Sequence, residues 1–366
     1  MRKRNLLLVA GACLATLSLT VGSALADPTG APATRILAGG GSDTTQDVMN
    51  ALSNVPASGS RIIGSYDATG ASPIVIGANG TKLPIAGSDC KITRPVGSKN
   101  GVLALVAERA AAAAPNPVRR PCLDFARSSA DLHADPAFAG SAGLTFVPFA
   151  GDQVSFVTRN DTLLPKNLTK AQLQAIYLCT APGTISNPPT ILPLIPQAGS
   201  GTRGFFLQAL ATNPTDPPIT PGSCVSSVDP TDPTKQLIEN SGNRLTDPRH
   251  IAPYSVGQFN SQYFGVVTPV QGSTELRRIN GQIPGSSSFP TEFQRLVYNV
   301  IPTSQVNNEP YKSTFVGTGS AVCANTSVIT QFGFTVLPSP VIPNSQCGDT
   351  SRTTGGSPAQ PGAPTN

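Results

Sequence analysis

The apolar residues of the chain follow two spacings: short consecutive runs, typical of buried strands, and recurrences every three to four residues, typical of helices. The first clear unit combines both. An apolar run at 35–38 predicts a strand, a glycine-rich turn follows it, and apolar residues within 48–52 recur at helical spacing. Ser42 or Asp43 is the expected N-cap of that helix, because a short polar side chain accepts a hydrogen bond from a first-turn amide.

The same alternation continues along the chain. Strands are expected at 61–66, 73–76, 144–147, 154–158, 191–195, 263–270 and 296–301. Helices are expected at 101–114, 169–178, 205–210, 251–260 and 327–334, and Thr169 with Gln172 fits a capping box. Strands that alternate with helices predict an α/β fold with mainly parallel sheets. The length of 366 residues exceeds the size of one hydrophobic core, so two lobes are expected.

The N-terminus has the order of a secretory signal peptide. Basic residues at 2–4 precede an apolar run at 6–17, and an Ala-x-Ala site at 24–26 follows. The signal peptide is therefore expected to span 1–26, with cleavage near Ala26 and a secreted or extracytoplasmic mature chain. A lipid anchor on Cys13 and a retained membrane anchor are the alternatives.

Charge gives no sign of a nucleic-acid partner. Without the three basic residues at 2–4, the 25 Lys and Arg residues nearly balance the 20 Asp and Glu residues. The mature chain thus lacks the strongly basic surface that nucleic-acid binding requires.

Six of the seven cysteines lie beyond the expected signal peptide, and an even number in an exported chain predicts disulfides. Six cysteines allow 15 connectivities. Pairing of nearest neighbours is the expectation: Cys90–Cys122, Cys179–Cys224 and Cys323–Cys347. No two cysteines form a C-x-x-C pair, so neither a zinc site nor a redox motif is predicted, and no cofactor is expected.

The most informative polar segment is Gly199-Ser200-Gly201-Thr202-Arg203, which follows an apolar run and precedes helical spacing. The first amides of a helix have no internal partner, and its dipole is positive at that end. Glycines let a ligand approach the backbone, and Ser200, Thr202 and Arg203 add donors. The segment is therefore a candidate anion site. A capped helix with nothing bound is the equally simple alternative.

Three further polar turns have similar chemistry, at 39–46, 97–101 and 125–129. Each has a plain structural explanation of its own, as an Asp N-cap or a surface loop. Four such segments in one chain are harder to explain separately.

These segments also carry a family resemblance. The chain resembles the phosphate-binding proteins of the Pst-type uptake system, which belong to the type II periplasmic substrate-binding superfamily, and its later part is similar to secreted actinobacterial relatives. The Ser-Gly-Thr-Arg loop at 200–203 looks like the family's phosphate loop. The Leu-Ala-Gly-Gly-Gly-Ser-Asp-Thr-Thr run from Leu37 looks like its first ligand loop, and 125–129 lies where the family has another. Order and spacing agree over about 35–300.

The resemblance implies a two-lobed type II periplasmic binding-protein fold with mainly parallel mixed sheets and a ligand cleft between the lobes. Lobe one would comprise 27–154 and 289–349, and lobe two 155–288. The Gly, Ser, Pro and Thr composition without apolar periodicity separately predicts a disordered tail at 350–366. The implied ligand-binding residues are Asp43, Thr44, Ser98, Arg127, Ser128, Ser129, Ser200, Gly201, Thr202 and Arg203.

Two of the family's charged positions differ in this chain. The family's carboxylate aligns with Ser129, and an arginine of the family aligns with Pro196. Asp43 is a candidate replacement for the missing acceptor, and Arg127 or Arg203 for the missing cation.

The sequence thus predicts an exported, monomeric protein that holds a small oxyanion, most simply phosphate, and that could serve an ABC transporter permease. The alternatives are another anionic ligand, or a secreted surface or matrix protein that keeps the fold with altered or lost binding. An enzyme is not predicted. Neither His133 nor His250 lies in a catalytic or metal-binding motif, and Ser200 lacks the G-x-S-x-G elbow.

Overall fold

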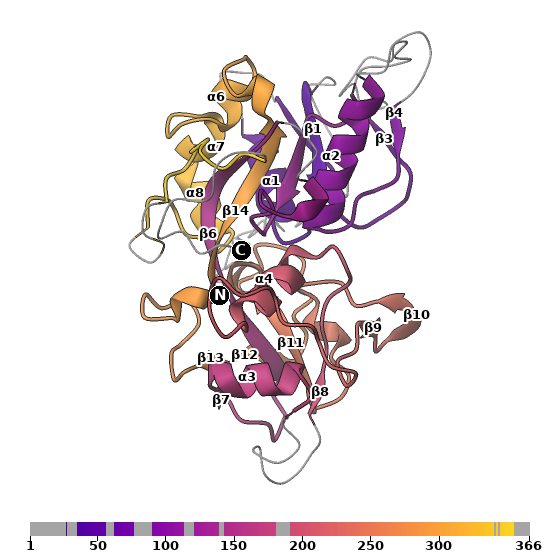
Figure 1. Ribbon diagram of the computed structural model, residues 1–366, viewed down its shortest axis with the longest axis vertical. Coiled ribbons are helices and arrows are strands. Elements are labelled where there is room, and N and C mark those ends of the chain that lie inside the picture. Colours follow the sequence, from indigo (N-terminus) through magenta and orange to yellow (C-terminus); the bar gives the residue numbers. More distant parts are fainter. Residues whose placement is uncertain are drawn as a thin grey trace, which may run out of the picture.

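The structure is a computed structural model that describes residue 27 and residues 35–55, 62–76, 90–112, 121–138, 143–180, 191–339, 342 and 345–354. The expected signal peptide at 1–26 lies outside these described residues. Two lobes are stacked along the long axis of the molecule (Figure 1). No helix among the described residues is long and apolar enough to cross a membrane.

One mixed sheet runs through both lobes. Its order is β2 (Ile63–Ser65), β1 (Leu37–Gly41), β5 (Phe125–Ser128), β14 (Gln294–Pro302), β6 (Leu144–Arg159), β11 (His250–Ser255) and β8 (Leu192–Pro193), with β12 (Thr274–Leu276) also paired to β6. β1 is parallel to β2 and β5, and β11 is parallel to β8. The central strand β6 is antiparallel to β14, β11 and β12.

Strand β6 connects the two lobes. Residues 144–153 pair with β14, and residues 154–158 pair with β11. The prediction of two separate strands, at 144–147 and 154–158, was wrong because the polar residues between them are paired inside the sheet. Asp152 bonds to Arg295, and Gln153 accepts a hydrogen bond from the Gly285 amide. Buried polar groups with partners do not have to interrupt a strand.

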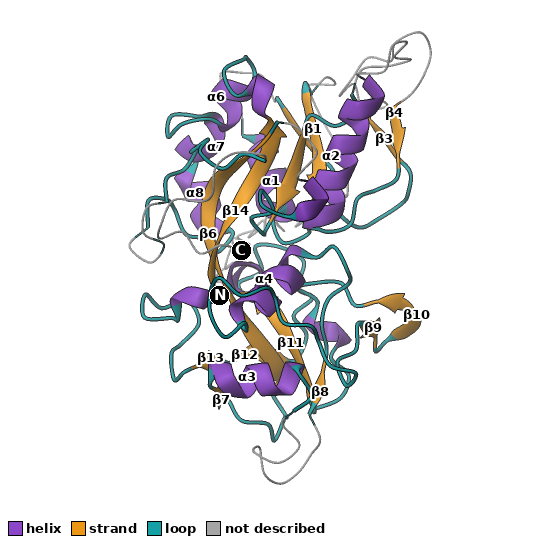
Figure 2. Ribbon diagram, in the orientation of Figure 1, coloured by secondary structure: helices purple, strands orange, loops and turns teal. Residues whose placement is uncertain are grey.

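Helices flank the strands of each lobe (Figure 2). Lobe one has α1 (Gln46–Asn54), α2 (Ser98–Ala112), α6 (Tyr311–Phe315), α7 (Ala321–Ala324) and α8 (Thr326–Gln331), with α2 packed on β1 and β5. Lobe two has α3 (Lys170–Tyr177), α4 (Gly201–Ala209) and α5 (Val256–Tyr263). Small strand pairs complete the lobes: β3 (Ile74–Ile76) with β4 (Cys90–Ile92), β7 (Asn167–Leu168) with β13 (Arg278–Ile279), and β9 (Val228–Asp229) with β10 (Asp232–Gln236). Short 3-10 turns lie at Pro136–Phe138, Gly242–Arg244, Thr291–Phe293 and Thr303–Gln305.

Each lobe has its own apolar core. One cluster of buried side chains draws only on residues before 151 and after 295, whereas two others draw on residues 154–293. Neighbouring residues of β6, Phe156 and Val157, belong to different clusters of lobe two, because successive side chains of a strand point to opposite faces. The sheet of lobe two is therefore covered on both sides.

Two local predictions need correction. The predicted order of helix at 251–260 and strand at 263–270 is reversed, since β11 pairs with β6 and Ser255 then caps α5 by accepting from the Gln258 amide. The first helix begins at Gln46 after Thr45, so neither Ser42 nor Asp43 is its N-cap. The predicted capping box at Thr169 is confirmed.

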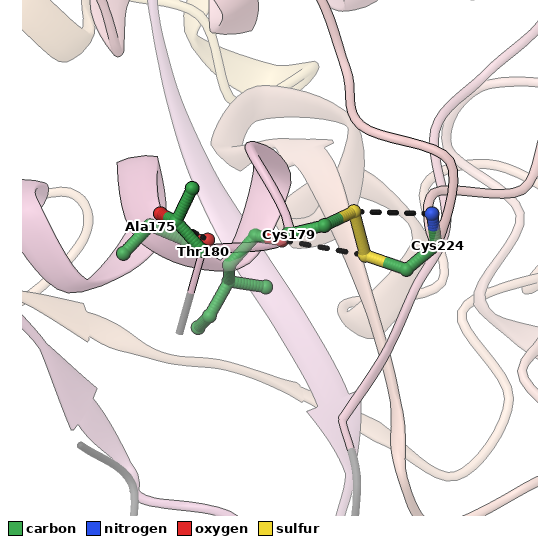
Figure 3. Close-up of a disulfide and its surroundings, with 5 residues drawn as sticks. Ala175, Cys179, Thr180 and Cys224 are labelled. Carbon is green, nitrogen blue, oxygen red and sulfur yellow. Dashed lines mark hydrogen bonds between the residues drawn. A yellow bond between two sulfur atoms is a disulfide. The ribbon is translucent and has the colours of Figure 1, made fainter. Parts of the chain in front are cut away.

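The three disulfides are those predicted from nearest neighbours: Cys90–Cys122, Cys179–Cys224 and Cys323–Cys347. Figure 3 shows Cys179–Cys224, which joins the end of α3 to the segment before β9. Cys179 has a positive φ of 61°, and the Thr180 amide donates to the Ala175 carbonyl, so the chain turns sharply away from the helix there. The disulfide thereby fixes the exit of α3.

The first residues of the expected tail are paired with lobe one. The Phe146 amide donates to the Arg352 carbonyl, the Thr354 amide donates to the Leu144 carbonyl, and Thr353 forms a bridge with Thr145. Residues 350–354 therefore lie along the start of β6, and residues 355–366 are outside the described part.

Candidate ligand site between the lobes

Four segments that the sequence singled out meet where the lobes face each other. The Thr44 and Thr202 hydroxyls, from different lobes, lie 3.2 Å apart. The Ser98 and Ser129 hydroxyls lie 3.3 Å apart, and a Cβ added to Gly201 would lie 2.3 Å from the Ser98 Oγ and 2.4 Å from the Ser129 Oγ. The turn after β1, the start of α2, the end of β5 and the start of α4 thus form one cluster, which we call the junction cluster.

Backbone groups also bridge the lobes. The Lys99 amide of α2 donates to the Gly199 carbonyl at 3.0 Å. Gly97 permits this approach, because it has a φ of 91° and a Cβ there would lie 2.6 Å from the Gly199 oxygen. Figure 1 shows the resulting position of α4, at the end of its lobe that faces the other lobe.

Thr44 is the residue on which the contacts from lobe two converge. The Asn240 side-chain amide donates to the Thr44 hydroxyl at 3.0 Å, and the Gln258 side-chain amide donates to the Thr44 carbonyl at 2.6 Å. Asn240 has a positive φ of 57°, a conformation that asparagine tolerates, and its side-chain oxygen accepts from the Ser255 amide. Thr44 is consequently held by two different segments of lobe two.

The N-terminus of α4 is occupied by a carboxylate of the protein itself. Glu239 Oε2 accepts from the Ser200 hydroxyl at 2.6 Å and from the Thr202 amide at 3.0 Å. Ser200 is the N-cap of α4, and its oxygen accepts from the Arg203 amide. A negative charge is favoured at this place by the helix dipole and by amides without partners in the helix.

Asp43 and Glu239 form a carboxyl pair across the junction. Burial, and then the charge of Glu239, raise the pKa of Asp43 well above its ordinary value. Burial also acts to raise the pKa of Glu239, but hydrogen bonds from Asp43 and from the start of α4 lower it. Like charges this close disfavour double ionisation, and both effects favour a shared proton on Asp43 over one on Glu239.

A buried cation lies next to this pair. Arg295 of β14 donates to the Thr202 hydroxyl at 3.1 Å and, through Nε and Nη2, to Asp152 Oδ2 at 3.0 and 2.8 Å. The Arg295 and Asp152 side chains are both 0% exposed, and the two residues are directly opposite in the pairing of β14 with β6. Asp152 Oδ1 also accepts from the Gly257 amide. The ion pair therefore joins β14 and β6 to α4 and α5.

Three residues of the predicted ligand set are turned elsewhere. Arg127 donates to the carbonyls of Ser42 and Tyr66 and to the Ser65 hydroxyl, all within lobe one. Arg203 donates to the Pro196 carbonyl, and the Ser128 hydroxyl donates to the Ala130 carbonyl. The remaining seven lie at the junction: Asp43, Thr44, Ser98, Ser129, Ser200, Gly201 and Thr202.

Comparison of the whole chain with known proteins bears on the fold. No family model matches the chain, and no curated protein matches it. Its structure is similar to that of a protein from Clostridium perfringens described as a phosphate ABC transporter substrate-binding protein with bound phosphate, with 13% identity over 83% of this chain and 100% of that one and a TM-score of 0.51. The fold is that of a two-lobed periplasmic binding protein. An ABC-type phosphate transport receptor from Vibrio cholerae is also similar, with 16% identity over 82% of this chain and 99% of that one and a TM-score of 0.48.

Within this periplasmic binding-protein fold, sequence reasoning missed Glu239, Asn240 and Arg295. Glu239 and Asn240 precede a Ser-Gly-Asn turn, which looks like an ordinary polar loop. Arg295 gave a usable signal, because a charged residue beside the apolar run at 296–301 needs a buried partner. Asp152, between Gly151 and Val154 in another apolar stretch, was the matching signal.

A further buried carboxyl, that of Asp67 near Arg127, leads to a prediction on stability. Burial raises the pKa of Asp67 to about 6, above the value of about 3.9 for an exposed aspartate, and Asp67 accepts from the Asn50 side chain at 2.6 Å. The folded protein therefore holds this proton more tightly than the unfolded chain, and the stability contributed by Asp67 falls as the pH rises from about 4 through 6.

Asp67→Asn retains the acceptor for Asn50 and removes the charge. We expect its free energy of unfolding to exceed that of the wild type by about 2 kcal/mol at pH 7.5 and to be nearly equal at pH 4. Urea denaturation at both pH values measures this. An equal difference at the two pH values would show that the ionisation of Asp67 is not the cause.

Proposed function

We propose that the protein is an exported binding protein that holds a small oxyanion, most simply phosphate, between its two lobes. The supporting observation is the junction cluster, in which hydroxyls and amides from both lobes meet at the N-terminus of α4. Such donors bind tetrahedral oxyanions. The similar structure from Clostridium perfringens holds phosphate, which is the ligand to test first.

The structure suggests a ligand set that differs in part from the one predicted. The donors would be Thr44, Ser98, Ser129, Ser200, Gly201 and Thr202, with Arg295 as the cation in place of Arg127 or Arg203. Asp43 would face the ligand as the acid group. Export would follow cleavage near Ala26, with lipidation of Cys13 as the alternative, and the receptor would act as a monomer that delivers its ligand to an ABC permease.

A thermal-shift series on the purified chain tests the proposal. Phosphate, sulfate, molybdate and a phosphonate are compared with chloride at equal ionic strength. A true ligand raises the unfolding midpoint progressively with the logarithm of its concentration, by mass action on the folded state. If no oxyanion raises the midpoint above the chloride control, the wild-type chain is not an oxyanion receptor.

One observation favours a second candidate, a secreted surface or matrix protein that keeps the fold but has altered or lost ligand capture. Glu239 already accepts the donors at the start of α4, and the lobes bond directly to each other through Thr44. Small-angle X-ray scattering separates the two candidates. A receptor changes its radius of gyration when phosphate is added, whereas a protein that has lost ligand capture gives the same scattering curve with and without it.

A further inference from the structure

The Glu239 carboxylate has the contacts that a bound anion would make. Its Oε2 accepts from one hydroxyl and one first-turn amide of α4, two donors that have no partner within the helix. Glu239 is only 3% exposed, so this is a buried contact and not a surface ion pair. One carboxylate thus occupies the N-terminus of α4 within the junction cluster.

The second oxygen of the same carboxylate lacks such donors. Glu239 Oε1 accepts from no backbone amide or hydroxyl among the described residues, and the other hydrogen bond of the carboxylate is with the Asp43 carboxyl. The neighbouring Arg295 guanidinium also has a donor without an acceptor. Its Nη1 is buried and has no acceptor among the described residues, while its Nη2 donates to Thr202. A buried charged group with an open donor indicates a place for a further acceptor.

The backbone on both sides of Glu239 is held in place. Leu237 donates to the Ser227 carbonyl and accepts from the Gln197 amide, and the Asn240 side chain bonds to Thr44 and Ser255. Glu239 itself lies between β10 and the 3-10 turn at Gly242–Arg244, outside helix and strand. These backbone contacts do not involve the Glu239 carboxylate, so a rotation of the side chain away from α4 would leave them intact.

Charge decides whether Glu239 and a ligand can share the site. The Arg295 charge is shared with Asp152, so it offsets the charge of the Glu239 carboxylate only in part. A second anion placed beside it would meet repulsion in a buried environment, where charge interactions are strong. Only one of the two anions can use the Ser200 and Thr202 donors at a time.

We propose that Glu239 is a built-in competitor for the anion position of α4, and that an oxyanion binds this chain by displacing the Glu239 carboxylate from Ser200 and Thr202. This inference rests on the proposed function. Under this proposal, the affinity of the chain for the oxyanion depends on Glu239, a residue that does not itself bind the oxyanion.

The test is isothermal titration calorimetry with inorganic phosphate, on the full chain purified after export from a bacterial host. Glu239→Ala frees both donors and removes the charge, and we expect it to bind phosphate at least about tenfold more tightly than the wild type, since hydrogen bonds to a charged group are strong. Glu239→Gln keeps the side-chain shape without the charge and should lie between the two. It also serves if the alanine variant does not fold. Glu309→Ala, a change to an exposed carboxylate in lobe one, should match the wild type.

The outcomes are separable. Tighter binding by each Glu239 variant that folds supports the competitor, even where the wild type binds too weakly to measure. If the wild type binds phosphate and the Glu239 variants bind equally or more weakly, Glu239 is part of the lining and the inference is wrong, while the proposed function stands. If neither the wild type nor any variant binds, both proposals fail.

Discussion

Arg295→Met is expected to lower the free energy of unfolding by about 3–5 kcal/mol, because it leaves the Asp152 charge buried without its partner. The Arg295 and Asp152 side chains are fully buried, and the Gly257 amide is the other donor to Asp152 among the described residues. Methionine fills much of the volume of arginine, so the loss reflects charge and hydrogen bonds more than a cavity. Urea denaturation of the variant and the wild type measures it.

Two matched variants identify the cause. Asp152→Asn added to Arg295→Met removes the unpaired charge and keeps the acceptor for Gly257, so the double variant should recover at least half of the lost stability. Arg249→Met disrupts the Arg249–Asp247 pair, whose side chains are 40% and 28% exposed, and should change stability far less. If Arg295→Met is as stable as the wild type, the buried Arg295–Asp152 pair does not hold β14 and β6 together.

Gly201→Ala is expected to force the lobes apart where they meet. The added Cβ would lie within 2.4 Å of the Ser129 oxygen and 2.3 Å of the Ser98 oxygen, and the Ser98 hydroxyl cannot rotate freely because it accepts from the Ser129 amide. We expect a loss of about 1–3 kcal/mol in the free energy of unfolding from overpacking. An increase in the radius of gyration by small-angle X-ray scattering should accompany it, together with weaker phosphate binding under the proposed function.

Gly204→Ala is the control within the same helix. Gly204 is exposed, and a Cβ there meets nothing within 4 Å. It should leave the scattering curve unchanged and stabilise α4 by about 0.5–1 kcal/mol, because alanine loses less backbone entropy than glycine. If Gly201→Ala behaves like Gly204→Ala, the lobes are not in contact at this point in solution.

The parts of the fold that could be predicted are those set by local chemistry. The capping box at Thr169 was predicted correctly, and the helix expected at 205–210 after the Gly-Ser-Gly-Thr segment begins within that segment, with Ser200 as its N-cap. The disulfides were also predicted, since each joins one cysteine to the next cysteine along the chain. The continuous strand β6 was missed, because its polar residues are satisfied by distant partners such as Arg295.

In the candidate site, too, the features set by nearby residues could be predicted, and those set by distant partners could not. Glycines and hydroxyls at strand ends marked the segments that meet at the junction, since that chemistry is visible within a few residues. The charged residues were harder, because the choice among Arg127, Arg203 and Arg295 depends on where each side chain finds its acceptors. Arg127 binds backbone carbonyls of lobe one, whereas Arg295 reaches Thr202 across more than ninety positions of sequence.

The two passages of the chain between the lobes lie next to each other, since Gln294, where the chain returns, is paired with Gln153, beside the place where it left. Two adjacent strands that share a hydrogen-bonded ladder bend together far more easily than they slide or separate. We therefore expect the lobes to move relative to each other by bending and twisting of this pair of strands. A distance between one label on each lobe, both far from β6, would follow the bend over time.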